Sequence, residues 1–230
     1  MPPPASGRTL PRVSTKSSAA TRTPSLTERR KAATQFDIAR AAAELFTERG
    51  PDGTTAEEIA VRAGVALRTF YRYFRNKQDA VGPLLAIGGD HWRERLAAVE
   101  PGTELPRALE SAVTASLTVP HEAKAEGLRW TRGLLRASAE DPALRAVWYR
   151  VNQESEDKLI PLVARLAGDA DPLEFRLTAA AATDAIRVAL ETWAEPDADV
   201  EGPGSPAELA VRCLRELTGG MRLLAEPRKG

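Results

Sequence analysis

Three places in the second half of the chain put a helix-capping side chain directly before a proline, at Asp141, Asp171 and Ser205. A side-chain oxygen at such a position accepts a hydrogen bond from the first helical turn, where the missing N–H of the proline costs nothing. The segments between these points are rich in Ala, Leu, Arg and Glu. No segment shows a convincing alternation of apolar and polar residues, which is the pattern of a β-strand. The sequence therefore predicts an all-α fold.

The helical reading extends from Leu26 to the C-terminal region. Gly, Pro and Asp separate the segments, and Glu174 and Glu208 stand three residues after a capping residue, which is capping-box spacing. We expect about nine helices. Their predicted bounds are 27–49, 55–63, 67–73, 76–98, 104–118, 122–138, 142–166, 172–194 and 206–224.

The composition is that of an ordinary globular protein. A chain of 230 residues with 43% hydrophobic residues can bury a good core, in one large domain or two unequal ones. No run of about 18 apolar residues is available to span a bilayer. The single cysteine, Cys213, cannot form an intrachain disulfide, and no apolar segment near the N-terminus suggests secretion. We expect a cytoplasmic protein with no membrane partner.

The net charge of zero conceals an asymmetry. Residues 1–80 hold 14 Lys and Arg against 8 Asp and Glu, and the remainder holds 18 against 24. This distribution fits a local nucleic-acid footprint, although a solvated surface gives the same pattern. Residues 1–25 contain five prolines and no acid, which predicts a disordered basic Pro/Ser-rich tail. A transit peptide, a DNA-reaching arm and an inert tail all remain open for this segment.

A short helix with a clear start and stop follows the first long helix. Thr55 and Glu58 have capping-box spacing, and Gly64 can take the left-handed conformation that ends a helix. Small Ala60 allows a second helix to approach closely, while Ile59, Val65 and Phe70 fill a shared core. This spacing indicates a helix-turn-helix.

The second helix of this motif combines aromatic and basic residues. Phe70 and Phe74 lie four apart and can face inward, which leaves polar side chains on the outer face. Arginine reads guanine edges, and threonine, tyrosine and helix N-termini bind phosphates. Lys77 adds a positive charge at the start of the next helix, after Asn76. A solvated helical hairpin is the alternative. The outer residues are Arg68, Thr69, Tyr71, Arg72 and Tyr73.

The stretch "FDIARAAAELFTERGPDGTTAEEIAVRAGVALRTFYRYFRNKQDAV" closely resembles the N-terminal domain of TetR-type bacterial transcriptional regulators, over about residues 28–82. The resemblance implies that Thr69, Tyr71, Tyr73 and Lys77 hold phosphates. Ala66 departs from the family's usual Ser or Thr, which removes the cap of the recognition helix at a cost of about 1 kcal/mol. By the same resemblance, Leu67, Arg68 and Arg72 approach bases, and Thr55 completes the predicted DNA-binding set.

A single recognition helix has a small footprint, so helix-turn-helix proteins usually dimerise to read two half-sites. In the TetR family the last two long helices of each subunit form the interface, and the matching helices here have suitable residues. Small alanines at 179–182 and a stripe along 172–194 permit close approach, and the last helix has a 4-3-4-3 apolar seam. The alternative is that both helices line the core of their own subunit and form no dimer interface. The expected interface residues are Leu177, Ala181, Val188, Ala210, Leu214, Leu217 and Met221, with Leu173 and Leu224 on the same stripes.

The helices between these two regions are expected to form a ligand pocket. A weaker resemblance, over about residues 125–195, relates this part to the mycofactocin-type TetR subgroup and implies an apolar or acyl-CoA-like effector. It also makes four arginines candidates for a ligand phosphate or carboxylate: Arg129, Arg132, Arg136 and Arg145. The candidate pocket aromatics, each of which is also compatible with ordinary core, are Trp92, Trp130, Trp148, Tyr149 and Trp193.

No catalytic or metal-binding pattern stands out. His91 and His121 lie far apart in sequence, and no glycine-rich phosphate loop, paired metal-ligand motif or G-x-S-x-G sequence occurs. We expect no enzyme activity, cofactor or metal. The predicted organisation is a tail (1–25), a three-helix DNA-binding domain (26–80) and a larger helical effector-binding and dimerisation domain (81–225).

The predicted function is that of a homodimeric one-component regulator, a repressor that binds a palindromic double-stranded DNA operator and is released by a small-molecule effector. A DNA-binding protein without an effector and a helix-turn-helix interaction module are the alternatives.

Overall fold

The computed structural model describes residues 25–100, 102–119 and 122–219. Within these ranges the regular elements are all helical, which confirms the all-α prediction. The tail predicted for 1–25 lies outside the described residues except for Ser25, and so do Met221 and Leu224. The elements are α1 (Leu26–Arg49), α2 (Ala56–Arg62), α3 (Leu67–Tyr73), the 3-10 helix η1 (Asp79–Val81), α4 (Gly82–Ala97), α5 (Leu105–Leu117), α6 (Glu122–Glu140), α7 (Pro142–Ala167), α8 (Pro172–Ala194) and α9 (Pro206–Thr218).

The three capping residues expected before prolines begin α7, α8 and α9. Asp141 accepts a backbone hydrogen bond at 2.8 Å, Asp171 at 2.9 Å and Ser205 at 3.3 Å, each from an N–H of the first turn. These bonds satisfy donors that have no partner within the helix. The predicted helix starts at these three positions are confirmed.

The prediction of one helix over 76–98 is wrong at its N-terminal end. The 3-10 helix η1 comes first, and α4 begins only at Gly82. Pro83 supplies no N–H to bond the carbonyl four residues earlier, which favours the start of an α-helix at this point over its interior. Asn76 still caps this region, because its side chain accepts a hydrogen bond from the Asp79 N–H at 2.7 Å.

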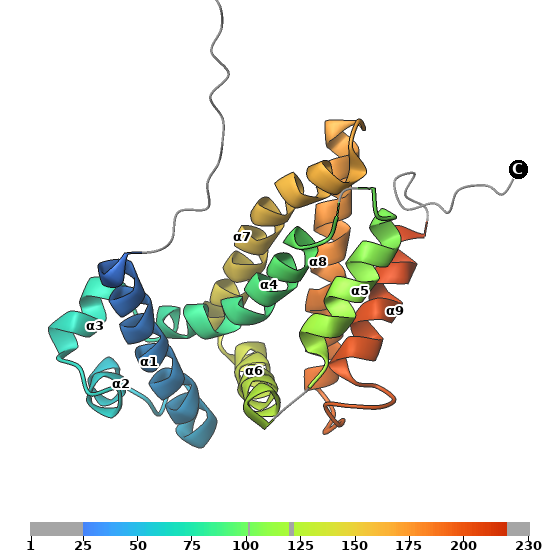
Figure 1. Cartoon of the computed structure of the whole chain (residues 1–230). Coiled ribbons are helices and arrows are strands. Elements are labelled where there is room, and N and C mark those ends of the chain that lie inside the picture. Colours follow the sequence, from blue (N-terminus) through green and yellow to red (C-terminus); the bar gives the residue numbers. More distant parts are fainter. Residues whose placement is uncertain (1–24, 101, 120–121, 220–230) are drawn as a thin grey trace, which may run out of the picture.

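The helices form two groups, and α4 leads from one to the other (Figure 1). Helices α1, α2 and α3 gather at one end of the molecule. In the larger group α4 packs against α5 and α7, while α8 packs against α7 and α9. None of the helices in the described ranges is both long and apolar enough to cross a membrane.

Two polar contacts connect the segment at η1 to α7 and to its N-cap, Asp141. The Gln78 side-chain amide donates to Asp141 at 2.9 Å, and Arg150 forms a 3.0 Å ion pair with Asp79. These contacts are additional to the packing of α1 against α4 and α6. The position of the three-helix group is therefore tied to the helices of the larger group.

Candidate functional site

The start of α2 and the turn between α2 and α3 both have the geometry that the sequence predicts. The Thr55 hydroxyl accepts from the Glu58 N–H at 3.2 Å, and the Glu58 carboxylate accepts from the Thr55 N–H at 2.8 Å. Gly64 has a φ of 67°, in the left-handed region that favours glycine. Ala66 precedes α3 and makes no side-chain cap. The capping box, the glycine turn and the missing cap are all confirmed.

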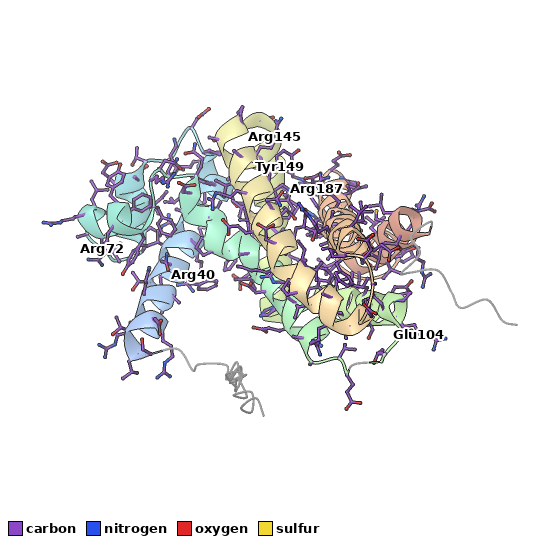
Figure 2. All side chains as sticks on the ribbon, turned by 90° about the horizontal axis from the view of Figure 1, so that it is seen from above. Arg40, Arg72, Glu104, Arg145, Tyr149 and Arg187 are labelled. Carbon is purple, nitrogen blue, oxygen red and sulfur yellow. The ribbon has the colours of Figure 1, made fainter. Side chains whose placement is uncertain are left out.

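Helix α3 is held by its aromatic residues and exposes its basic ones. Phe70 is 0% exposed and Phe74 is 6% exposed, as predicted for inward-facing residues. Arg68, Tyr71 and Arg72 are exposed on the outer face. Figure 2 shows Arg72 at the end of the molecule away from Tyr149 and Arg187. The remaining predicted DNA-binding residues of this helix, Leu67, Thr69 and Tyr73, are half-buried.

The two exposed arginines of α3 differ in their contacts. Arg72 lies over the Tyr73 ring, 4.9 Å from its centroid, and donates to the Tyr73 hydroxyl at 3.3 Å. Arg68 makes no hydrogen bond or ion pair with any residue in the described parts of the chain. Arg68 is therefore free to contact a ligand, whereas Arg72 must first leave Tyr73.

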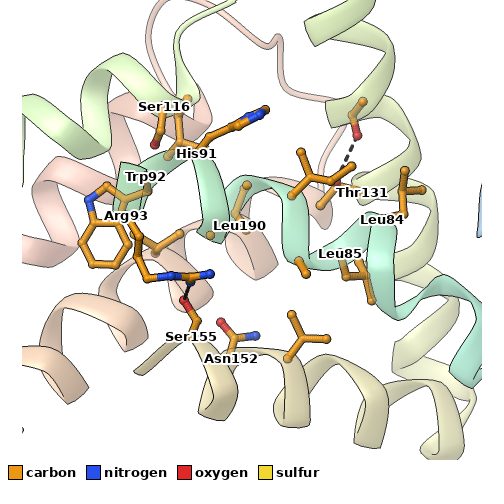
Figure 3. Close-up of a pocket in the computed structure, with 18 of the residues that line it drawn as sticks. Leu84, Leu85, His91, Trp92, Arg93, Ser116, Thr131, Asn152, Ser155 and Leu190 are labelled. Atoms are coloured by element: carbon orange, nitrogen blue, oxygen red, sulfur yellow. Dashed lines mark hydrogen bonds between the residues drawn. The ribbon is translucent and has the colours of Figure 1, made fainter. Parts of the chain in front are cut away.

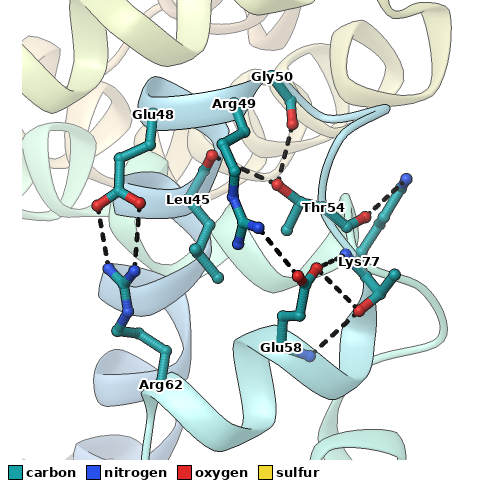
Figure 4. A network of polar contacts seen from close by, with 9 residues as sticks. Leu45, Glu48, Arg49, Gly50, Thr54, Glu58, Arg62 and Lys77 are labelled. Carbon is teal, nitrogen blue, oxygen red and sulfur yellow. Dashed lines mark hydrogen bonds and ion pairs between the residues drawn. The ribbon is translucent and has the colours of Figure 1, made fainter.

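A polar network stabilises the loop between α1 and α2 (Figure 4). Arg49 and Glu58 form a 2.9 Å ion pair, and Arg62 pairs with Glu48 at 3.1 Å. The backbone N–H of Thr55, its hydroxyl and Arg49 hold the pKa of the Glu58 carboxyl below its ordinary value. Thr55 therefore has its hydroxyl engaged in the cap, where it orders the start of α2.

Lys77 extends into the same loop rather than away from it. Its ammonium donates to the Pro51 carbonyl at 2.7 Å and to the Thr54 carbonyl at 3.0 Å, and the residue is half-buried (Figure 4). Two of its three N–H donors are thus used within the protein. The phosphate contact expected for Lys77 rests on its third donor.

We expect Lys77→Met to lower the free energy of unfolding by about 1 to 2 kcal/mol, because two hydrogen bonds from a charged donor are lost. Urea denaturation followed by circular dichroism measures the loss. Arg75→Met is the matched control, since Arg75 is exposed and makes no contact in the described residues. Equal stability of the two variants would show that the Lys77 contacts contribute nothing to folding.

The larger helical group encloses a cavity of 270 Å³ between α4, α5, α6, α7 and α8 (Figure 3). Phe36 of α1 is also among its lining residues. A cavity of this size is far larger than a single water requires and is suited to a small organic molecule. Most of its wall is apolar. The apolar lining residues include Leu84, Leu85, Ile87, Leu117, Leu128, Val151, Ile186 and Leu190.

One buried cation lies in the wall of this cavity. Arg93 of α4 is 7% exposed, and its guanidinium donates to the Ser155 hydroxyl of α7 and to Asp90 (Figure 3). Gly89 makes this contact possible, because a Cβ there would lie 3.0 Å from the Ser155 oxygen. The close approach of α4 and α7 therefore places a charged group among apolar side chains.

Two known protein families match this chain, one over the helix-turn-helix and one over the larger helical group. Residues 38–81 match the family described as "Bacterial regulatory proteins, tetR family", and residues 103–221 match "MftR C-terminal domain". The second match covers more than half of the chain. The chain belongs to the TetR family. Members of this family are transcriptional regulators rather than enzymes, as the sequence predicts.

Individual relatives support this assignment. The chain is 31% identical over 201 residues to the HTH-type transcriptional regulator TcmR of Streptomyces glaucescens, which covers 84% of this chain and 87% of that protein. The HTH-type transcriptional repressor Rv3405c of Mycobacterium tuberculosis is 35% identical over 89 residues, or 36% of this chain and 47% of that protein.

Solved structures share the fold. The TetR-family repressor AlkX from a Dietzia strain has a TM-score of 0.54 at 19% identity, over 83% of this chain and 98% of that one. FadR of Thermus thermophilus, a TetR-family repressor crystallised with lauroyl-CoA, has a TM-score of 0.51 at 24% identity, over 85% and 99%. These likenesses concern the arrangement of the helices.

The aromatic residues proposed for the pocket of this TetR-family chain fall into two groups. Trp92, Trp130 and Trp148 line the cavity. Trp193 is fully buried outside it, beneath the Arg132 guanidinium at 3.9 Å, and Tyr149 is 50% exposed in a shallow surface groove between α7 and α8. The cavity therefore brings together three of the five candidates.

None of the four arginines proposed from the subgroup resemblance lines the cavity. Arg136 donates to the Ala194 carbonyl at 2.6 Å, and Arg132 donates to the Ala198 carbonyl. Arg145 donates to the Ser138 carbonyl at 3.0 Å. These arginines satisfy carbonyls at and beyond the C-terminal ends of α8 and α6, where cations are favoured. Arg129 is exposed on α6.

The seam expected on the last helix divides between two environments. Ala210 is 0% exposed and Leu214 is 2% exposed, so both lie in the core of the subunit itself. Leu217 is 47% exposed. An ion pair at 2.6 Å between Arg215 and Glu110 of α5 helps to hold α9 with its Ala210 and Leu214 face toward its own subunit. Helix α9 thus packs one face against its own subunit and leaves Leu217 open.

The stripe on α8 is more exposed. Leu177 is 49% and Val188 is 37% exposed, with half-buried Ala181 between them and Leu173 at 60%. Nine large apolar side chains are exposed among the residues that the structure describes, and four of them lie on α8 and α9. An apolar surface concentrated in this way favours a protein contact.

Sequence reasoning missed Arg93, Ser155 and Thr183 of the cavity wall. One available signal was the pair Gly88 and Gly89 within a predicted helix. A glycine in a helix interior costs about 1 kcal/mol relative to alanine, so a pair of them suggests that something approaches the backbone closely. At Gly89 that neighbour is the contact between Arg93 and Ser155.

Proposed function

We propose that this TetR-family protein is a homodimeric repressor that binds a palindromic operator and is released by a small molecule in the cavity. The observation that carries the proposal is the outer face of α3. There Arg68, Tyr71 and Arg72 are exposed on a helix fixed from behind by Phe70 and Phe74. A rigid helix with a basic outer face suits the major groove of DNA.

The role of each α3 residue follows from its exposure. Arg68 is the best candidate for base contact, because it is exposed and makes no contact within the described chain. Tyr71 and Arg72 stand beside it, while half-buried Thr69 and Tyr73 are suited to phosphates at the groove edge. Leu67 lies at the N-terminal end of α3, where base contacts are made in this motif.

Dimerisation through α8 and α9 supports reading of a palindrome. The exposed Leu177, Val188 and Leu217, with Ala181 among them, provide the apolar surface that a second copy would cover. Two copies related by a twofold axis would present two α3 helices to half-sites about 34 to 36 Å apart. Ala210 and Leu214 would support this interface from inside each subunit.

The cavity supports the effector part of the proposal. It lies against α4, which also follows η1 and so connects directly to the three-helix group. A ligand that displaces α4 would move α1 to α3 and change the distance between the two recognition helices. The lauroyl-CoA in the Thermus thermophilus relative illustrates an effector with a long apolar part, and the apolar wall here suits one.

Binding to the DNA beside the gene, measured against salt concentration, tests the proposal. Phosphate contacts release counterions, so the affinity should fall steeply with salt, with a slope of about −0.9 per contact. A random fragment of equal length should bind more weakly at every salt concentration. Absence of binding at low salt would favour an interaction module over a DNA-binding regulator.

A further inference from the structure

The cavity wall contains hydrogen-bond donors that have no acceptor. The Thr183 hydroxyl of α8 and the Trp92 indole N–H are both buried without a partner among the described residues. The Ser155 hydroxyl accepts from Arg93 and donates to nothing in the same part of the chain. A buried donor without an acceptor is costly, so the Ser155 and Thr183 hydroxyls favour a ligand that brings an acceptor into the cavity.

Unpaired charge around the cavity has one sign. The charged lining residues are three cations, Arg93, Lys124 and Lys158, and one acid, Glu154. Glu154 already pairs with Arg150 at 3.2 Å, and Arg93 pairs with Asp90. Lys124 makes no ion pair in the described residues, and burial together with the charge of Arg95 lowers its pKa. Lys124 and Lys158 are therefore the lining cations without an ion pair in the described residues, and an anion bound beside Lys124 would oppose the lowering of its pKa.

We propose that the effector is an apolar molecule with one anionic group, and that Arg93, Ser155 and Thr183 hold this group at the wall between α4, α7 and α8. The anion would accept hydrogen bonds from the two hydroxyls and interact favourably with the two lysines that have no ion pair in the described residues. Figure 3 shows Arg93, Ser155 and neighbouring Asn152 together on one side of the cavity. This inference rests on the proposed function, because it specifies the ligand of the same cavity.

Thr183 provides a sensitive test because α8 contains a matched control. Thr178 also has a buried hydroxyl without a partner, but it does not line the cavity. Replacement of either threonine by valine removes a hydroxyl that makes no hydrogen bond, so neither variant should lose stability. Only Thr183→Val should affect a ligand in the cavity.

Two fluorescent probes separate the anion from the apolar body. 8-Anilinonaphthalene-1-sulfonate and N-phenyl-1-naphthylamine have the same aromatic skeleton, but only the first carries a sulfonate. We expect the sulfonate probe to bind the full-length protein more tightly. Thr183→Val should weaken it by about tenfold and Lys124→Met by about threefold, with the neutral probe unchanged. Thr178→Val should change neither probe.

Equal affinity for the two probes, or a sulfonate affinity that Thr183→Val leaves unchanged, would overturn the inference. Release of operator DNA by each probe, measured in parallel, distinguishes failure of the anion site from failure of the proposed effector function. If the neutral probe binds and releases DNA as well as the sulfonate, the effector function stands and the anion site fails. If the sulfonate probe binds as expected without releasing DNA, the anion site stands and effector release fails.

Discussion

Replacement of both Leu177 and Val188 by aspartate is expected to give a folded monomer that has lost specific operator binding. Both side chains are substantially exposed in the single chain, so the subunit itself should tolerate the change. In the proposed dimer the four new carboxylates would be buried without partners, which opposes association strongly. A monomer has no fixed half-site spacing, so its affinity should fall by about 10³-fold, to the non-specific level.

Sedimentation equilibrium measures the mass of this double variant, and circular dichroism measures its helix content. Leu214→Asp is the contrasting control, because Leu214 is 2% exposed and its replacement should unfold the subunit. A double variant that remains a dimer and still binds its palindrome would show that α8 does not form the interface. Unfolding of the double variant would assign Leu177 and Val188 a role within the subunit.

Arg68→Ala is expected to lower affinity for the operator by about 1 to 3 kcal/mol, roughly 5- to 150-fold, and to relax preference at one base position per half-site. The reason is that Arg68 is exposed on α3 without a partner in the described chain, ready to bond a base edge. Competitive binding to a set of operators that differ at single positions measures the loss.

Arg62→Ala is the matched control for this experiment. Arg62 lies on neighbouring α2 and is bound by Glu44 and Glu48, so its loss should leave base preference unchanged. Arg72→Ala should also lower specific affinity, but Arg72 must first leave the Tyr73 ring, which reduces its net contribution. If Arg68→Ala weakened specific and random DNA equally, Arg68 would instead be a phosphate contact.

The helix starts could be predicted because short-range hydrogen bonds determine them. The bounds predicted for 172–194 coincide with α8, whose N-cap Asp171 bonds a donor two residues away. Phe70 and Phe74 could be placed inward for the same local reason, since a four-residue spacing puts them on one face of α3. The helix-turn-helix is a continuous stretch, so its sequence signal is also continuous.

The cavity and the proposed dimer interface were harder to predict because they depend on which helices meet. The spacing of Leu214 and Leu217 indicates a helix face that packs, but it does not indicate whether the neighbour is the same chain or a second copy. Arg93 and Ser155 are separated by 62 positions, and no local pattern relates them. In the same way, no local pattern indicates that Lys77 donates to the distant Pro51 and Thr54 carbonyls.

A footprint on the DNA beside the gene tests the central claim most directly. Purified protein, added to this fragment before limited nuclease digestion, should protect an inverted repeat whose two halves lie one helical turn or a multiple of it apart. Arg68→Ala should lose the protection at protein concentrations where the Arg62→Ala control retains it. Protection of a single half-site, or uniform coverage without sequence preference, would contradict a dimer that reads a palindrome through α3.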